Sequence, residues 1–167
     1  MTMPTVLKSQ YHASLAMLRG AIDACPPAEW ANGAGRNAYW QIAYHALFYT
    51  HFYLQPGESG FVPWEHHRPD YHRLRADADA AHALVPYTPP ELAAYARLCD
   101  AMVDDAIDRM DLAASESGFP WYRMSKLEHQ LVNLRHIQHH TGQLADRLRQ
   151  SAGHGMRWIG GTPGPPA

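Results

Sequence analysis

Cysteine is scarce in this 167-residue sequence, where Cys25 and Cys99 stand far apart and match no zinc-ribbon or redox spacing. We therefore expect two small, buried apolar residues in a reducing compartment. Long apolar runs are also missing, which argues against a membrane-spanning helix. Residues 1–12 lack the charged and apolar regions of a secretion signal. These absences predict a cytoplasmic protein that does not enter a membrane.

An excess of basic charge is missing as well. The sequence has 14 Lys and Arg residues against 16 Asp and Glu, a formal charge of −2, whereas proteins that bind nucleic acid through phosphate contacts are usually basic. We therefore expect no nucleic-acid partner. Histidine, by contrast, is abundant, and its 12 residues would move the charge from −2 to +10 if all were protonated. The sequence thus predicts pH sensitivity and supplies many candidate metal ligands.

Apolar residues recur at steps of three and four in four segments, and no segment has convincing strand character. Capping residues mark three of the helix starts. Asn37 is the predicted N-cap of the second helix, and the capping-box patterns Thr88 to Glu91 and Ser125 to Glu128 open the third and fourth. The predicted helices span roughly residues 7–22, 37–54, 88–110 and 125–150.

The second and third helices are separated by a connection over residues 55–88, in which a short helix near 73–83 is expected. A connection of this length is uncommon in a compact domain unless it crosses the fold or builds a site. We therefore predict an all-α four-helix bundle over residues 1–150, with one long crossover between helices 2 and 3. Residues 151–167 are rich in glycine and proline and are predicted to form a loose C-terminal tail.

The fourth helix carries a polar stripe beside its apolar stripe, a position where polar groups are costly unless they find partners. Two of its members, His136 and His140, are one turn apart and can share one ion. A third ligand must come from a neighbouring element, and His45 lies in the middle of the nearly all-apolar second helix. The members of the stripe are His129, Asn133, His136, His140, Gln143 and Arg147.

Three imidazoles suit zinc, nickel, copper or iron, and they leave coordination positions open for water or substrate. The alternative, that these histidines are ordinary core or surface residues, stays open because a single pair of histidines one turn apart is a weak pattern. His51 is a reserve ligand, whereas His139 faces away from the pair.

Four further residues are candidates for lining the pocket or supporting the ligands. Tyr49, one turn after His45, can offer a phenol to a bound ligand, although packing is the ordinary role of such a tyrosine. His129 either lines the pocket or solvates a helix end. Gln143 and Arg147 can steady ligands or the groups behind them.

Two segments of the chain resemble one known family. The segment EHQLVNLRHIQHHTGQL, residues 128–144, resembles the closing helix of the DinB/YfiT-like superfamily, with two histidines one turn apart and a small-residue and GQ ending. Thr141 stands where an arginine is common in the family. The segment WQIAYH, residues 40–45, is similar to the family pattern of an aromatic residue followed by a histidine. The resemblance covers roughly residues 1–150.

The resemblance implies a four-helix bundle, often dimeric, in which His45, His136 and His140 hold a divalent metal, commonly zinc or nickel. Some members are transferases or isomerases that use a low-molecular-weight thiol such as mycothiol or bacillithiol, and many have no known activity. A related iron-dependent domain serves ergothioneine synthesis, but Gly142 occupies the position of its characteristic glutamate. We therefore expect a homodimeric, metal-dependent, thiol-linked S-transferase or isomerase that acts on a small electrophile.

Two other classes of function remain open at this stage. The first is a non-catalytic metal-binding or stress-linked protein, in which a three-histidine site serves structure or sensing. The second is a helical protein with structural histidines whose task is association. A sealed site with a fourth protein ligand would favour the first, and a large apolar surface without a reachable cavity would favour the second.

Overall fold

The regular structure of this chain is helical throughout the residues that the computed structural model describes, which are 2–33, 37–74 and 84–161. The prediction of an all-helical fold is thereby confirmed for these residues. None of the described helices combines the length and apolarity that a membrane crossing requires. The helices are α1 (Met3–Ala24), α2 (Pro27–Trp30), α3 (Tyr39–Tyr53), α5 (Pro89–Arg109) and α6 (Lys126–Ala152).

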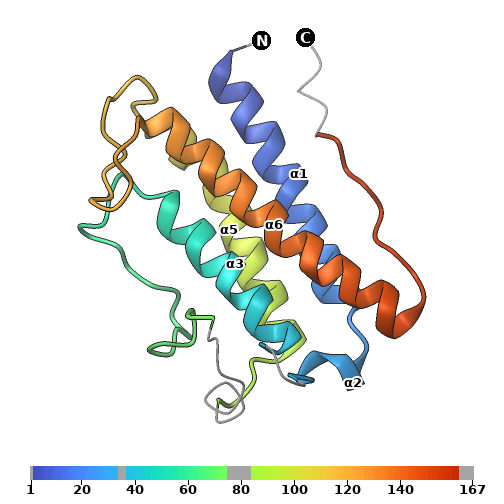
Figure 1. Cartoon of the computed structure of the whole chain (residues 1–167). Coiled ribbons are helices and arrows are strands. Elements are labelled where there is room, and N and C mark those ends of the chain that lie inside the picture. The colour runs from blue at the N-terminus through green and yellow to red at the C-terminus, as the bar shows by residue number, and fades with distance from the viewer. Residues whose placement is uncertain (1, 34–36, 75–83, 162–167) are drawn as a thin grey trace.

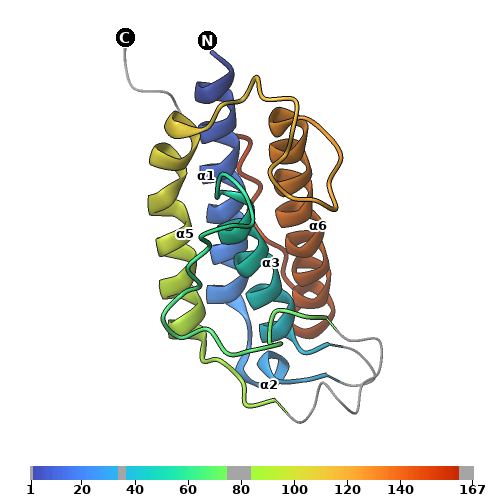
Figure 2. The same ribbon diagram turned by 90° about the vertical axis from the view of Figure 1, so that its left-hand side faces the viewer.

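Four long helices pack around a shared apolar core, and each lies against two others (Figures 1 and 2). Helix α1 packs against α5 and α6, and α3 packs against α6 and α5, so that α1 and α3 are nearly diagonal. The contact of α3 with α6 is extensive and joins the two segments that carry the candidate ligands. Among the largest fully buried side chains are Trp40, Tyr11, Tyr44 and Tyr95.

The helix starts follow the predicted signals in two of three places. Thr88 and Glu91 form a complete capping box, in which the Glu91 side chain accepts the Thr88 N–H at 2.6 Å. At α6, Ser125 Oγ accepts the backbone N–H of Glu128 at 3.2 Å.

The prediction of Asn37 as a cap is wrong. Helix α3 begins at Tyr39 with Ala38 as its N-cap, and the side chain of Gln41 reaches back to accept the Ala38 N–H at 2.7 Å. The start of α3 is therefore stabilised by a side chain from inside the helix, which accepts the N–H of the N-cap residue, and not by a polar side chain at the N-cap.

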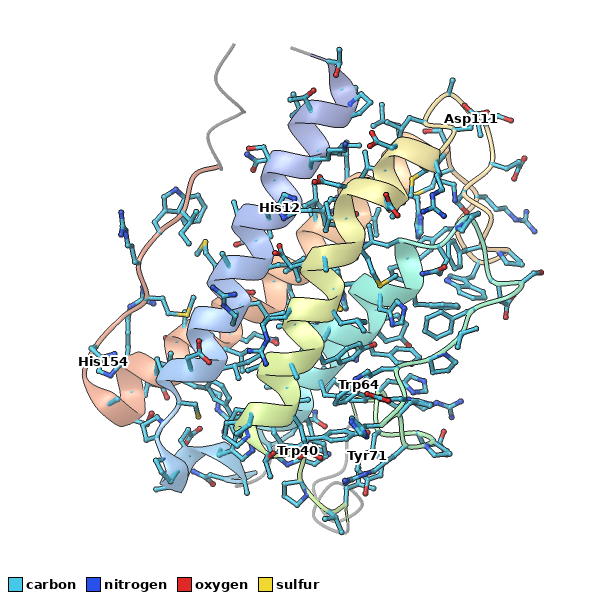
Figure 3. All side chains as sticks on the ribbon, turned by 180° about the vertical axis from the view of Figure 1, so that it is seen from behind. His12, Trp40, Trp64, Tyr71, Asp111 and His154 are labelled. Carbon is cyan, nitrogen blue, oxygen red and sulfur yellow. The ribbon has the colours of Figure 1, made fainter. Side chains whose placement is uncertain are left out.

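The connection between α3 and α5 is anchored on the helices by aromatic rings. Trp64 stacks on Tyr95 of α5 with ring centroids 4.4 Å apart, and Tyr87 lies 4.7 Å from Tyr44 of α3. Figure 3 shows Trp64 in this connection beside the helices. The short helix expected near residues 73–83 lies almost wholly outside the described residues, and 73–74 are not helical.

A cluster of opposite charges joins α1 to α5. His12 Nδ1 is 2.7 Å from Asp100 Oδ1, and Lys8 Nζ is 2.7 Å from Asp108 Oδ1. Figure 3 shows His12 on α1 where this helix runs beside α5. Partial burial lowers the pKa of His12, but its hydrogen bonds with Asp100 and Asp104 outweigh that effect and raise it.

The chain beyond α6 returns along the bundle (Figure 1). Gly153, with a φ of 71°, ends α6 in the left-handed conformation that glycine adopts without strain. The carbonyl of Gly160 then accepts a hydrogen bond from Gln10 of α1 at 3.1 Å. Trp158 remains 73% exposed, whereas the half-buried Met156 packs against the apolar core.

A buried ion pair fixes the far end of α6. Arg147 Nε donates to Glu29 of α2 at 2.6 Å, and the guanidinium also donates to the carbonyls of Asn37 and Asn32 at 2.8 and 2.7 Å. Arg147 is only 5% exposed and Glu29 6%. The guanidinium thus holds α2, the segment before α3 and α6 together.

We predict that Arg147→Met destabilises the protein by about 3–5 kcal/mol, because it leaves the buried Glu29 carboxylate without its counter-charge. Urea unfolding measures this loss. The double variant Glu29→Gln with Arg147→Met should lose less, and Arg135→Met, at an exposed position of the same helix, should stay within about 0.5 kcal/mol of the parent. Equal losses in the single and double variants would contradict the assignment.

Candidate metal centre

Three histidine rings from two helices meet between α3 and α6. His45 Nε2 is 3.0 Å from His136 Nε2, which is 3.1 Å from His140 Nε2. One ligand atom from each residue lies within 4.8 Å of the other two, so this cluster could hold a metal ion. His136 and His140 share a face of α6, as their four-residue spacing predicts. The long packing of α3 against α6 brings His45 to the same level.

Two of the rings are oriented through their other nitrogen. His45 Nδ1 is 2.6 Å from the carbonyl oxygen of His72, and His140 Nδ1 is 2.8 Å from Oε1 of Gln143. Since both oxygens can only accept, each Nδ1 carries the hydrogen and each Nε2 of the neutral ring is a lone-pair donor. Metal-bound histidines typically make this kind of outer hydrogen bond.

Burial keeps the cluster in its neutral form. The pKa of His45 is lowered to about 4 and that of His136 to about 3, first by desolvation and to a smaller extent by the neighbouring imidazoles, while the hydrogen bond to the His72 carbonyl partly opposes this at His45. The pKa of His140 is also lowered, first by burial. Neutral imidazole is the form that binds metal, so these rings need not release a proton to coordinate an ion near pH 7.

The contacts among the rings leave a conflict that a cation would relieve. A single hydrogen on His136 Nε2 can point at only one of its two neighbours, so in the other contact, at about 3 Å, the neighbour's lone pair faces a nitrogen with no hydrogen to offer it. His136 Nδ1 is buried and has no hydrogen-bond partner within residues 2–33, 37–74 and 84–161. Two nitrogens each about 2.0–2.1 Å from a tetrahedral zinc ion would lie roughly 3.3 Å apart, and the three-histidine donor set suits borderline metals. The residues therefore fit a divalent ion.

Two of the predicted accessory residues touch the cluster. Gln143 accepts from His140 as described above, and its amide nitrogen lies 3.3 Å from His139. The Tyr49 ring lies 4.8 Å from the His45 ring and 5.5 Å from the His136 ring, measured between centroids. Tyr49, His45 and His136 are all half-buried, so this side of the cluster is reached by solvent.

The other two accessory candidates lie elsewhere. Arg147 is engaged with Glu29 and backbone carbonyls at the end of the bundle, as described above. His129 is fully buried, and its ring contacts Tyr53, Phe119 and Tyr122 at centroid distances of 4.8, 4.7 and 5.1 Å. Its contacts are thus with an aromatic cage and not with the three histidines. The two-turn spacing between His129 and His136 does not reveal these aromatic neighbours, because none of them lies on the same helix.

The remaining histidines take different partners. His51 Nδ1 lies 3.1 Å from the Tyr95 hydroxyl of α5, so the structure does not bring this reserve ligand into the cluster. His139 is exposed, as predicted. The contribution of His72 was missed from the sequence. It acts on His45 through its backbone carbonyl, a group that every residue carries and no motif reveals.

Comparisons of the chain with models of protein families, with curated proteins and with solved structures found no match.

The caged His129 should make stability depend on pH. Burial, and then the nearby Lys126 charge, lower its pKa to about 4, whereas the unfolded chain has the ordinary value of about 6.5. The folded state therefore favours the neutral ring, and its contribution is present above pH 6.5 and lost as pH falls toward 4. For one group this difference is worth about 3 kcal/mol.

We predict that His129→Leu makes the free energy of unfolding depend less steeply on pH between about 4 and 6.5. Urea unfolding across this range measures the slope. Asn133→Leu is the matched control, since it removes a fully buried polar group of the same helix that does not titrate. The prediction fails if the His129 variant retains the parental slope.

Proposed function

We propose that the protein is a metal-dependent enzyme of the DinB/YfiT-like type, a four-helix bundle with a long crossover between α3 and α5. In this proposal His45, His136 and His140 hold a divalent ion, zinc or nickel in the first place and iron in the second. The reaction is a thiol-dependent S-transfer or isomerisation on a small electrophile. One observation carries the proposal: His136 Nε2 lies about 3 Å from the Nε2 atoms of both His140, on the same helix, and His45, on a sequence-distant one.

The arrangement of the helices supports the same family type. The four long helices lie side by side, and the connection that joins α3 to α5 is far longer than a turn. The three proposed ligands also lie in the two segments that carry the resemblance, His45 in residues 40–45 and the other two histidines in residues 128–144. A homodimer, which this family often forms, belongs to the proposal as well.

A bound divalent cation would lower the pKa of a coordinated thiol and so supply a thiolate near neutral pH. The chain contributes positioning. The His72 carbonyl and Gln143 hold two of the rings by hydrogen bonds, and burial keeps the rings neutral. In this proposal a small molecule approaches from the side where His45, Tyr49 and His136 are half-buried, and Tyr49, whose ring lies against His45 and His136, offers its hydroxyl to the substrate.

A non-catalytic metal site is the second candidate. A structural zinc site is usually closed by four protein ligands. Among the described residues the cluster supplies three, two of them half-exposed. This vacancy favours chemistry over a purely structural ion.

We predict that protein purified without a metal-affinity tag, and incubated with zinc or nickel, binds one ion per chain. His136→Ala should lose this ion, because two imidazoles rarely hold it alone, and elemental analysis measures the loss. His139→Ala is the matched control, an exposed histidine of the same helix that should keep full stoichiometry. Absence of metal in the parent protein, or loss of metal in both variants, would overturn the proposal.

Cobalt-loaded protein distinguishes catalysis from storage. Addition of mercaptoethanol should produce a thiolate-to-cobalt charge-transfer band in the near ultraviolet if the ion has an open position. Stoichiometric cobalt without such a band would instead favour the non-catalytic candidate.

We predict that Gln143→Leu weakens zinc affinity about ten- to hundredfold, because His140 loses the acceptor that orients its ring. Competition with a chromophoric chelator measures the affinity. Gln138→Leu, on the same helix but away from the ring nitrogens of the cluster, should leave the affinity unchanged. Equal affinities in the two variants would show that the Gln143 contact does not support the ligand.

A further inference from the structure

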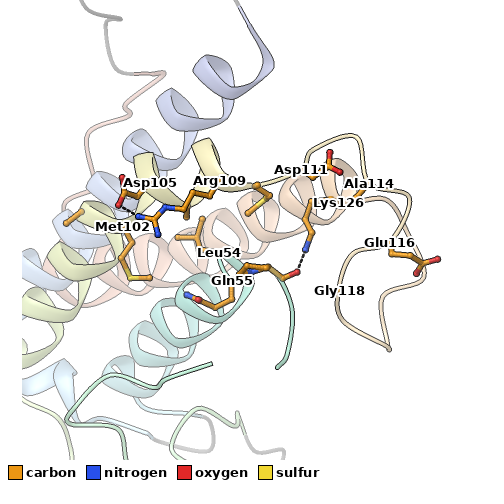
Figure 4. Close-up of a pocket in the computed structure, with 14 residues that line it drawn as sticks. Leu54, Gln55, Met102, Asp105, Arg109, Asp111, Ala114, Glu116, Gly118 and Lys126 are labelled. Carbon is orange, nitrogen blue, oxygen red and sulfur yellow. Dashed lines mark hydrogen bonds and ion pairs between the residues drawn. The ribbon is translucent and has the colours of Figure 1, made fainter. Parts of the chain in front are cut away.

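A cavity of about 610 Å³ lies at the end of the bundle where α3 and α5 finish and α6 begins (Figure 4). Its volume is within the range of small-molecule sites. The walls come from the residues that directly follow α3, the second half of α5, the loop between α5 and α6, and the first residue of α6. Apolar side chains contribute much of this lining, among them Leu54, Met102 and Met110.

One nearly buried charge lines this cavity. Lys126, the first residue of α6, is 5% exposed. Its Nζ donates to the carbonyl of Pro56 at 2.7 Å and to the carbonyl of Ser117, and Figure 4 shows it directed toward the end of α3. No carboxylate of the described residues forms an ion pair with it. An ammonium group has three hydrogens. Two go to the carbonyls, and the Phe119 ring, whose centroid is 5.4 Å from Nζ, offers only a weak cation–π contact, so the third hydrogen has no full acceptor among the described residues.

The acidic residues around the cavity lie at its outer edge. Asp105 pairs with Arg109, and both side chains are about three-quarters exposed. Glu116 and Asp111 are exposed, and in Figure 4 their carboxylates point away from the apolar wall. Charges in water are screened and act weakly on the interior. The charge that a ligand meets beside the apolar wall is therefore the ammonium of Lys126.

We propose that this cavity binds a small monocarboxylate with an apolar chain, with its carboxylate on Lys126 Nζ and its chain against Leu54, Met102 and Met110. An amine of the same shape would place a second cation beside the buried ammonium. A phosphate would bring more negative charge past the acidic edge and find a single free donor. A monocarboxylate satisfies the remaining hydrogen and supplies the missing counter-charge.

The experiment uses octanoate and octylamine, which share a chain and differ in charge, on protein labelled with ¹³C at the methionine methyl groups. The protein is stripped of metal with a chelator, so that a carboxylate cannot bind at the histidine cluster. Octanoate should shift the Met102 and Met110 signals saturably and leave Met17 and Met156 in place, and octylamine should bind at least tenfold more weakly. Stronger binding of octylamine, or octanoate shifts spread over all methionines, would overturn the proposal.

Two variants test the assigned contacts. Lys126→Met should weaken octanoate at least tenfold, whereas Arg109→Gln, which removes an exposed cation of the same cavity, should change it less than twofold. Lys126 also holds two loops, so its replacement can disturb the fold. Ala106→Phe therefore provides a second test, because it fills the cavity and leaves Lys126 intact. This variant should abolish the Met102 shift. Unchanged octanoate binding in Ala106→Phe, or a loss in Arg109→Gln alone, would contradict the site.

The histidine variant separates this inference from the proposed metal function. His136→Ala should bind octanoate as the parent does, because the cavity is lined by other residues. Loss of octanoate binding in this variant would show that binding depends on the histidine cluster and overturn the cavity site.

Discussion

The antiparallel packing of α3 against α6 is the constraint on which the candidate metal site depends. Side chains of α6 bond to the backbone of α3 or of the segment before it on both sides of the histidines, so the two helices are held in one register. A shift of one residue along either helix would move His45 by about 1.5 Å relative to its partners and turn it to another face. The fixing contacts are Gln130 to the Tyr53 carbonyl, Asn133 to the Thr50 carbonyl and Arg147 to the Asn37 carbonyl.

This interface explains the polar stripe beside the apolar stripe of α6. Three of its residues contact α3: Asn133 donates to the Thr50 carbonyl, and the rings of His136 and His140 lie against His45. Packing alone would favour apolar side chains at these positions. Three atoms of this stripe, His129 Nε2, Asn133 Oδ1 and His136 Nδ1, are buried and have no hydrogen-bond partner among the residues that the structure describes. Each such group costs about 1–3 kcal/mol. A helix face that buries several polar groups without partners lowers the stability of the fold. Such a face is more typical of a functional site than of a surface that serves packing alone.

Much of the fold was accessible from the sequence because it depends on local signals. Periodicity and capping gave the helices, and the spacing of His136 and His140, with His45 in an apolar helix, gave the cluster. The failures concern partners, which periodicity does not specify. Arg147 shares the polar stripe, but its partner Glu29 lies on a four-residue helix with no periodic pattern. The cavity beside Lys126 arises where three segments meet, and no single segment carries its pattern.

The histidine cluster itself contributes little to the free energy of folding, so the contacts that stabilise the fold are different from those that form the candidate metal site. Its rings are buried enough to lose hydration, yet their nitrogens face one another where a hydrogen bond can satisfy only part of the set. The surrounding aromatic packing and the α6 to α3 hydrogen bonds must therefore hold the helices together against this local conflict. An ion bound by the three nitrogens would remove this conflict. Because such an ion binds only the folded protein, it would also stabilise the folded state. Rings held neutral and already oriented by His72 and Gln143 would need little rearrangement to hold an ion.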